Sequence, residues 1–292
     1  MISLPEGIDA PTVCEILRDA GDIMVDAHRE KYGIVDGVED KDSTHAGVNF
    51  VTKYDREVQA FLFRELGRAC PEASFLGEED NGQEKVNPYR GWCFVIDPID
   101  GTANFVRDYR CSSISVALLN NGQPAMGAIY LPYWDMTFYA EAGRGARCMS
   151  HFEFFAGWRN SVPVLRTPYR PLAEGICALG TSPYYKETLG DATVQLFETF
   201  FQHCSDIRRS GSAAFDLCCV ATGRTDVFVE ARLSPWDYAA GALIVSEAGG
   251  RVTRLDGRSL RYDKPCSVLA TGAGCYDEAL ALTRNIKIPL EN

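Results

Sequence analysis

Several strand-length apolar runs follow one another in the middle of the chain, with no helix-length segment between them. The runs at residues 114–119 and 125–131 flank a turn signal at 120–122. Glycine, which is part of that signal, readily takes the positive φ that a tight hairpin turn requires, so the pattern predicts an antiparallel hairpin. A further run at 137–140 would extend the hairpin into a meander. Such a sheet has an apolar face that other elements must cover.

Helical patterns stand on both sides of this meander. After Asp9, apolar residues recur at three- and four-residue steps as far as Ala27, which predicts one amphipathic helix. A second helix is expected from Thr52, whose hydroxyl can cap its first turn. Beyond residue 170, the expected strands are 176–179, 206–208, 226–229 and 266–270, and the expected helices are 191–203, 212–222, 235–248 and one from 277.

The order of these elements predicts mixed αβ layering, an α+β arrangement in which helices cover sheets. No internal repeat and no low-complexity linker interrupts the 292 residues. One unit over residues 1–292 is therefore expected. A division into two αβ subdomains, residues 1–150 and 170–292, stays open as an alternative.

Charge and cysteine usage exclude several classes of protein. The chain has 29 basic and 40 acidic residues, a formal net charge of -11, and non-specific nucleic-acid binding depends mainly on Lys and Arg. The 11 cysteines show no Cys-x-x-Cys spacing, and several lie in apolar runs, which favours buried reduced thiols. No signal peptide and no membrane-spanning stretch are visible. We therefore expect a cytoplasmic protein with no nucleic-acid or membrane partner.

Two acidic residues stand directly after the apolar run at 92–96. Asp97 and Asp100 are three residues apart, with Pro98 and Gly101 beside them. Because Pro98 fixes its own φ and Gly101 allows a tight backbone turn, both carboxylates can point toward one place. Oxygen ligands of this kind suit hard cations such as Mg²⁺. A solvated turn is the simpler explanation of the motif when it is taken alone.

Three further acids weaken that simpler explanation. Glu78 follows a short predicted strand, Asp55 lies in the first turn of the helix from Thr52, and Asp237 begins another helix, where a carboxylate meets the positive end of the helix dipole. The four histidines are scattered along the sequence, which argues against a zinc site. Acids at element ends, without a basic phosphate patch, suggest a centre of several metal ions that binds an anionic ester.

Other charged residues near these motifs are expected to lie on the surface. Glu79 and Asp80 are expected to be solvated. Arg208 and Arg209 could steer phosphate, but they are expected to pair with surface carboxylates, because Arg beside a strand usually does so.

At this point the motifs resemble those of the inositol monophosphatase family. The resemblance covers roughly residues 10–285 in the family's order. It rests on Asp97-Pro98-Ile99-Asp100-Gly101-Thr102 with Asn104-Phe105, on Gly77-Glu78-Glu79, and on Trp236-Asp237 leading into Glu247-Ala248-Gly249-Gly250. It implies a layered αβαβα fold like that of inositol monophosphatases and fructose-1,6-bisphosphatases. It also implies a magnesium-dependent, lithium-sensitive phosphatase that forms a homodimer.

The resemblance implies a centre with two to three Mg²⁺ ions. Glu78, Asp97 and the carbonyl of Ile99 would bind the first ion. Asp97, Asp100 and Asp237 would bind the second, and Glu78 would share a weaker third.

Catalytic and substrate-binding roles follow in the same way. Thr102, hydrogen-bonded to Asp55, would position the attacking water together with Glu78. The residues that would bind the phosphate or line the substrate are Asp100, Gly101, Thr102, Gly211, Ser212, Ala213, Glu230 and Asp237. Among these, the backbone N–H groups of Gly101 and Thr102 would receive phosphate oxygens, and Glu230 would contact substrate hydroxyls.

The substrate stays open among small phosphate esters. The resemblance favours myo-inositol monophosphate, with fructose-1,6-bisphosphate, 3'-phosphoadenosine 5'-phosphate and histidinol phosphate as alternatives. An alternative of another class is a regulatory binding protein on the same fold. The aromatic stretch 147–158 departs from the family pattern and could repack a sheet edge, form an oligomer contact or reshape the pocket.

Overall fold

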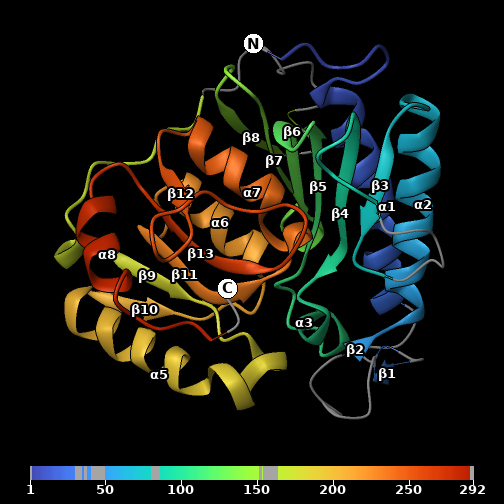
Figure 1. The fold of residues 1–292 in the computed structure, drawn as a ribbon. Helices are drawn as coiled ribbons and strands as arrows, with labels where there is room; N and C mark the ends of the chain where they lie inside the picture. Colours follow the sequence, from blue (N-terminus) through green and yellow to red (C-terminus); the bar gives the residue numbers. More distant parts are fainter. Residues whose placement is uncertain are drawn as a thin grey trace.

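Two amphipathic helices form the first layer of the fold. Helix α1 (Ala10–Arg29) and helix α2 (Lys53–Ala69) both pack their apolar stripes on one face of a sheet (Figure 1). Thr52 caps α2, because its hydroxyl accepts the backbone N–H groups of Tyr54 and Asp55. The computed structural model describes residues 2–29, 35, 38–40, 50–79, 86–150, 153 and 164–289.

A six-stranded sheet forms the second layer. Its strands stand in the order β3-β4-β5-β6-β7-β8, and all neighbours are antiparallel except β3 and β4. The strands are β3 (Ser74–Gly77), β4 (Trp92–Asp100), β5 (Ser113–Asn120), β6 (Gln123–Leu131), β7 (Met136–Glu141) and β8 (Ala146–Ser150). Asn121 and Gly122 have φ of 50° and 77°, which confirms the predicted β5–β6 hairpin.

This sheet is buried on both faces. Along β4, Phe94 and Ile96 belong to the core under α1 and α2, whereas Cys93 and Val95 belong to the core on the opposite face. The side-chain period of two in a strand produces this division. The continuous apolar runs that predicted these strands therefore reflect burial from both sides.

Helices α6 (Ala213–Ala221) and α7 (Pro235–Glu247) form a central layer between the first sheet and a second one (Figure 1). The second sheet is mixed, in the order β10-β9-β11-β13-β12. Its strands are β9 (Ile176–Leu179), β10 (Asp206–Arg208), β11 (Val227–Leu233), β12 (Arg251–Thr253) and β13 (Cys266–Thr271). Helices α5 (Lys186–His203) and α8 (Tyr276–Thr283) cover its outer face. The expected αβαβα layering is thereby confirmed.

Short elements complete the described chain. They are β1 (Glu39–Asp40), β2 (Phe50–Val51), α3 (Thr102–Val106), and the 3₁₀ turns η1 (Pro132–Trp134), η3 (Leu172–Glu174) and η4 (Pro183–Tyr185). Of the aromatic stretch 147–158, residues 147–150 lie in β8. Residues 151–152 and 154–158 lie outside the described residues, so its interpretation stays a prediction, as does the subdomain division.

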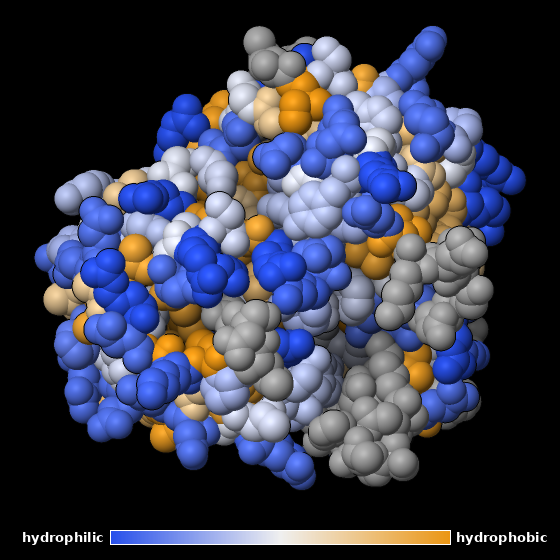
Figure 2. All heavy atoms as spheres, viewed as in Figure 1, coloured by the Kyte–Doolittle hydropathy of each residue, from blue (hydrophilic) through white to orange (hydrophobic). Residues whose placement is uncertain are grey.

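Most of the cysteines are buried, as the sequence predicts. On the face of Figure 1, apolar atoms appear in small separate patches among polar ones (Figure 2). No helix in the described ranges has both the length and the apolar character needed to cross a membrane. All 11 cysteines are free thiols; Cys111, Cys148 and Cys204 are partly exposed and the others are buried.

Strand β6 and helix α7 lie close together at Gly127. A Cβ atom there would lie 2.8 Å from the Ala240 carbonyl oxygen and 2.9 Å from its Cα. Gly127→Ala is therefore expected to push the sheet and helix apart and to lower the free energy of unfolding by about 1–3 kcal/mol in urea denaturation. Gly190→Ala in α5, where a Cβ would meet nothing within 4 Å, is the matched control. Equal urea midpoints for Gly127→Ala and the parent protein would contradict the close-packing argument.

Candidate active site

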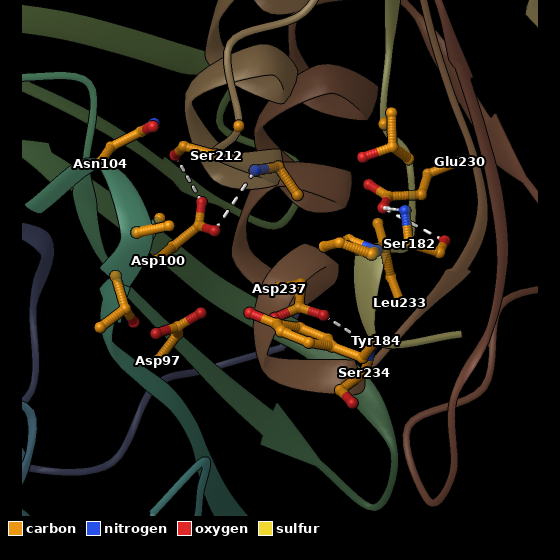
Figure 3. Close-up of a pocket in the computed structure, with 18 of the residues that line it drawn as sticks. Asp97, Asp100, Asn104, Ser182, Tyr184, Ser212, Glu230, Leu233, Ser234 and Asp237 are labelled. Atoms are coloured by element: carbon orange, nitrogen blue, oxygen red, sulfur yellow. Dashed lines mark hydrogen bonds between the residues drawn. The ribbon is translucent and has the colours of Figure 1, made fainter. Parts of the chain in front are cut away.

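A cavity of about 620 Å³ lies where the first sheet, α3, α6 and the start of α7 meet (Figure 3). Its walls come from segments that are far apart in the sequence. Of the residues singled out in the sequence, Glu78, Asp97, Ile99, Asp100, Gly101, Thr102, Gly211, Ser212, Ala213, Glu230 and Asp237 all line it. Asp55 does not line it and contacts it through Thr102. The structure thus brings the proposed metal and substrate residues to one place.

The end of β4 turns two carboxylates into this cavity. Residues three apart in a regular strand point to opposite faces. The pairing of β4 with β5 shifts its register between Asp97 and Asp100, and this irregularity brings both side chains to the cavity. Asp97 is 1% exposed, and its Oδ1 accepts the Ile99 backbone N–H at 3.1 Å. The strand is longer than the predicted 92–96, so the two acids lie within it rather than after it.

Asp100 joins the first half of the chain to α6. Its Oδ2 accepts the Ser212 hydroxyl at 2.6 Å and the Ala214 backbone N–H at 2.7 Å (Figure 3). Its Oδ1 accepts the Ala213 backbone N–H at 3.3 Å. Asp100 therefore satisfies orphan N–H groups at the start of a helix more than a hundred residues away.

Asp237 is fixed by the first turn of α7. Its Oδ2 accepts the Ser234 backbone N–H at 2.7 Å, as half of a capping box (Figure 3). Pro235 follows Ser234 in the first turn, where its missing N–H costs nothing. The local sequence thus fixes the direction of this carboxylate.

The carboxylates in the cavity repel one another. Burial, followed by the charges of Glu78, Asp100 and Asp237, raises the pKa of Asp97 well above its usual range. The pKa of Asp237 is raised by burial and then by Glu78 and Asp100. Burial also raises the pKa of Asp100 to about 6, although the hydrogen bond from Ser212 opposes this rise. Positive charge between these groups would relieve their repulsion.

The chemistry of these donors fits a hard cation. They supply only carboxylate and carbonyl oxygens, which Mg²⁺ prefers over nitrogen or sulfur. Over the described ranges, no group of three or more His, Cys, Asp or Glu side chains is already arranged to hold a metal ion. Asp97, Asp100 and Asp237 each accept a backbone N–H group. The donor set therefore fits Mg²⁺ in its chemistry.

A buried chain of hydrogen bonds links α2 to the cavity. Oδ2 of Asp55 accepts the Thr52 backbone N–H at 2.7 Å and the Thr52 hydroxyl at 2.6 Å. Oδ1 of Asp55 lies 3.2 Å from the Thr102 hydroxyl, which also lies 3.1 Å from the Ile99 carbonyl oxygen. The Thr102 hydroxyl has one proton and donates it to one of these two acceptors. The structure thus contains the Thr102–Asp55 contact that the resemblance implied.

Glu230 stands on the opposite wall of the cavity from Asp100 (Figure 3). Its Oε1 accepts the backbone N–H and the hydroxyl of Ser182 at 2.7 and 3.2 Å. A Cβ at Gly180 would lie 1.9 Å from Oε2, so glycine is needed beside this carboxylate. Burial raises the pKa of Glu230 to about 7 against the opposing effect of the Ser182 hydrogen bonds. Ser182 was missed in the sequence, since its partner is 48 residues away and no motif marks it.

Two of the expectations from the sequence are wrong, the solvated position of Glu79 and the carboxylate partner of Arg209, which is itself exposed. Glu79 is 8% exposed, and its backbone N–H and carbonyl are held by the Gln59 side chain at 3.0 and 2.9 Å. This amide clamp keeps the strand end at Glu78 in place. Arg209 lines the cavity and donates to the Thr181 hydroxyl at 3.1 Å. The expectation for Arg208, which pairs with Asp206, is confirmed, whereas Asp80 lies outside the described residues.

The chain is similar in sequence to several known proteins. A sequence model described as the inositol monophosphatase family matches residues 10–287. An inositol-1-monophosphatase of Bacillus subtilis (strain 168) is 32% identical over 222 residues, which cover 76% of this chain and 78% of that protein. A fructose-1,6-bisphosphatase/inositol-1-monophosphatase of Thermotoga maritima is 34% identical over 272 residues, 93% of this chain and 94% of that protein.

Two further relatives carry other names. Nus factor SuhB of Escherichia coli (strain K12) is 32% identical over 241 residues, 82% of each chain. The crystal structure of extragenic suppressor protein suhB from Bartonella henselae superposes with a TM-score of 0.77 at 30% identity, over 96% of this chain and 98% of that one. The layered architecture is therefore one that solved structures share over almost the full length.

Proposed function

Because this chain belongs to the inositol monophosphatase family and is a phosphomonoesterase, we propose that it hydrolyses a small polyol phosphate in a Mg²⁺-dependent reaction. The leading substrate is myo-inositol monophosphate, and the products are the free alcohol and inorganic phosphate. Fructose-1,6-bisphosphate, 3'-phosphoadenosine 5'-phosphate and histidinol phosphate stay as alternatives. Support for the first alternative comes from the name of the Thermotoga maritima relative.

One observation carries this proposal. Carboxylates from three separate segments, at residues 78, 97–100 and 237, line one cavity, where burial and then the charges of neighbouring carboxylates raise the pKa of Asp97 and of Asp237. Burying like charges together without compensation is costly. In an active site, bound cations would offset this cost. In a structural core, nothing would offset it.

The proposed roles follow the position of each side chain. Glu78, Asp97, Asp100, Asp237 and the Ile99 carbonyl would hold two to three Mg²⁺ ions. When bound, such ions supply the positive charge that activates water and offsets the charge on the phosphoryl oxygens.

The chain's own groups orient the reactants. The Thr102 hydroxyl, held by Asp55, positions the attacking water together with Glu78. Backbone N–H groups of Gly101 and Thr102 receive phosphate oxygens, at the start of α3, where Gly101 has a φ of 85° that glycine adopts without strain.

Substrate recognition is proposed for the opposite wall. The alcohol part of the ester would lie along Gly211, Ser212 and Ala213 and would donate a hydroxyl hydrogen bond to Glu230. The cavity wall there is polar and closely packed, since Ser182 and Gly180 fix the Glu230 carboxylate. Hydrolysis in this scheme needs no covalent enzyme intermediate.

Removal of divalent cations is the direct test of the proposed reaction. Phosphate release from the ester alternatives named above is measured with Mg²⁺ and again after EDTA treatment. We expect the best ester to lose about 100-fold or more in turnover with EDTA and to recover when Mg²⁺ is restored. Turnover that EDTA leaves unchanged would contradict the metal assignment, and no turnover of any ester would favour the regulatory alternative.

That alternative has one specific support, the relatives named Nus factor SuhB. A regulatory role on the same fold would not require the acidic cavity. A homodimer, lithium sensitivity and a cytoplasmic location remain predictions that the family resemblance and the sequence supply.

A further inference from the structure

Helix α6 carries one buried acid that the proposed reaction does not use. Asp216 is 3% exposed, lies in the first turn of α6 and lines the cavity. The other buried residues of this helix are apolar or small, as a central helix between two sheets requires. A carboxylate among them costs free energy unless its oxygens find partners.

Among the described residues, one of the two Asp216 oxygens has a hydrogen-bond partner. The Ser210 hydroxyl donates to Oδ2 at 2.7 Å. Across the described part of the chain, Oδ1 accepts no hydrogen bond, and it is not among the side-chain atoms sealed from solvent. Because the residue is buried everywhere else and lines the cavity, this oxygen is accessible from the cavity side. If Asp216 only held the loop at residues 209–212 through Ser210, its Oδ2 would be sufficient.

The charges around Asp216 come from both walls of the cavity. Asp100 and Glu230 raise its pKa, burial raises it most, and Ser210 and Arg209 oppose the rise, so that it reaches about 7. Arg209 also lowers the pKa of Glu230. Arg209 therefore acts on both carboxylates and reduces their repulsion, so Asp216 and Glu230 can line the same cavity.

From this geometry we infer that Asp216 is a substrate-binding residue, whose Oδ1 accepts a hydrogen bond from a hydroxyl of the ester's alcohol part. The inference rests on the proposed phosphatase function and adds a second acceptor beside Glu230. Two carboxylates that line the cavity outside the proposed metal ligands select an alcohol with at least two free hydroxyl groups. An ester without hydroxyls would cover Asp216 and leave a buried charge unpaired, which is how polar sites reject poorer substrates.

Two esters that differ in hydroxyl content test this assignment. The polyol ester is the best substrate among myo-inositol 1-phosphate, fructose-1,6-bisphosphate and glycerol 2-phosphate, and the hydroxyl-free ester is p-nitrophenyl phosphate. The measured quantity is the ratio of kcat/KM for the polyol ester to that for p-nitrophenyl phosphate, in saturating Mg²⁺. For Asp216→Asn, which keeps the shape and an acceptor for Ser210, we expect this ratio to fall about tenfold or more. Asp216→Ala should lower it at least as far.

Asp206→Asn is the matched control, since Asp206 is exposed on β10 and does not line the cavity. It should leave the ratio as in the parent protein. An unchanged ratio in both Asp216 variants overturns the inference, and so does an equal loss on both esters, which would indicate a structural role. A parent protein that hydrolyses neither ester overturns the proposed function itself, a result distinct from either of these.

Discussion

Asp97→Asn is expected to abolish Mg²⁺-dependent phosphate release while leaving the protein folded. The substitution keeps the size of the side chain and an oxygen for the Ile99 backbone N–H, but it removes a negative charge shared by both proposed ion sites. We expect a loss of at least about a thousandfold in kcat, because the charge that offsets the phosphoryl oxygens would no longer be held. Phosphate release with Mg²⁺ varied over a wide range is the measurement. Asp237→Asn should behave in the same way, because Asn can still accept the Ser234 N–H.

Stability separates this result from simple unfolding. Folding raises the pKa of Asp97, so its ionised form is disfavoured in the folded protein and stability falls as pH rises through the carboxyl range. Neutral Asn removes this repulsion. In EDTA at neutral pH the melting temperature of Asp97→Asn should therefore equal or exceed that of the parent protein. Turnover like that of the parent in either variant would refute the metal assignment, and a large drop in melting temperature would assign the side chain a structural role.

The sequence predicts which helices and strands form the layers better than it predicts where these elements begin and end. The central strands and helices could be predicted because each contains a strong apolar pattern, a continuous run in a strand or three- and four-residue steps in a helix. Helix α5 begins at Lys186 rather than at the predicted residue 191. Its first residues are mostly polar, and they directly continue the 3₁₀ turn η4. Strand β8 was not predicted, because its sequence lacks a strong apolar pattern and its partner β7 defines its position.

The site could be predicted where chemistry is local and could not where it depends on distant partners. The motif at 97–102 carries its own turn residues, and Asp237 carries its own capping box, so both were visible in the sequence. Ser182 holds Glu230 across 48 residues, and Gln59 holds Glu79 across 20. No short sequence motif predicts contacts between residues so far apart in the chain. The same limit left the role of Arg209 undecided, because nothing local in the sequence separates it from Arg208, which pairs with Asp206.

Thr102→Ala is expected to lower kcat by about 100-fold with little change in KM. The Thr102 hydroxyl lies 3.2 Å from a buried Asp55 oxygen, and Asp55 is itself fixed by two hydrogen bonds from Thr52. When the hydroxyl donates to Asp55 rather than to the Ile99 carbonyl, its lone pairs can face a water in the cavity. Loss of such positioning costs about 10²–10⁴-fold in comparable proton-transfer steps. Steady-state kinetics on the best ester provide the measurement.

The conservative variant decides whether the hydroxyl itself matters. Thr102→Ser keeps the donor and should retain most of kcat, whereas a role in packing alone would make it resemble Thr102→Ala. If Asp55 acts through Thr102, Asp55→Asn should lower kcat in the parent protein but add little to Thr102→Ala, since both substitutions break one interaction. Additive losses would separate the two residues and leave Asp55 as a helix cap only. Non-additive losses of kcat would thus show that Asp55 acts through Thr102, since a helix cap alone would not produce them.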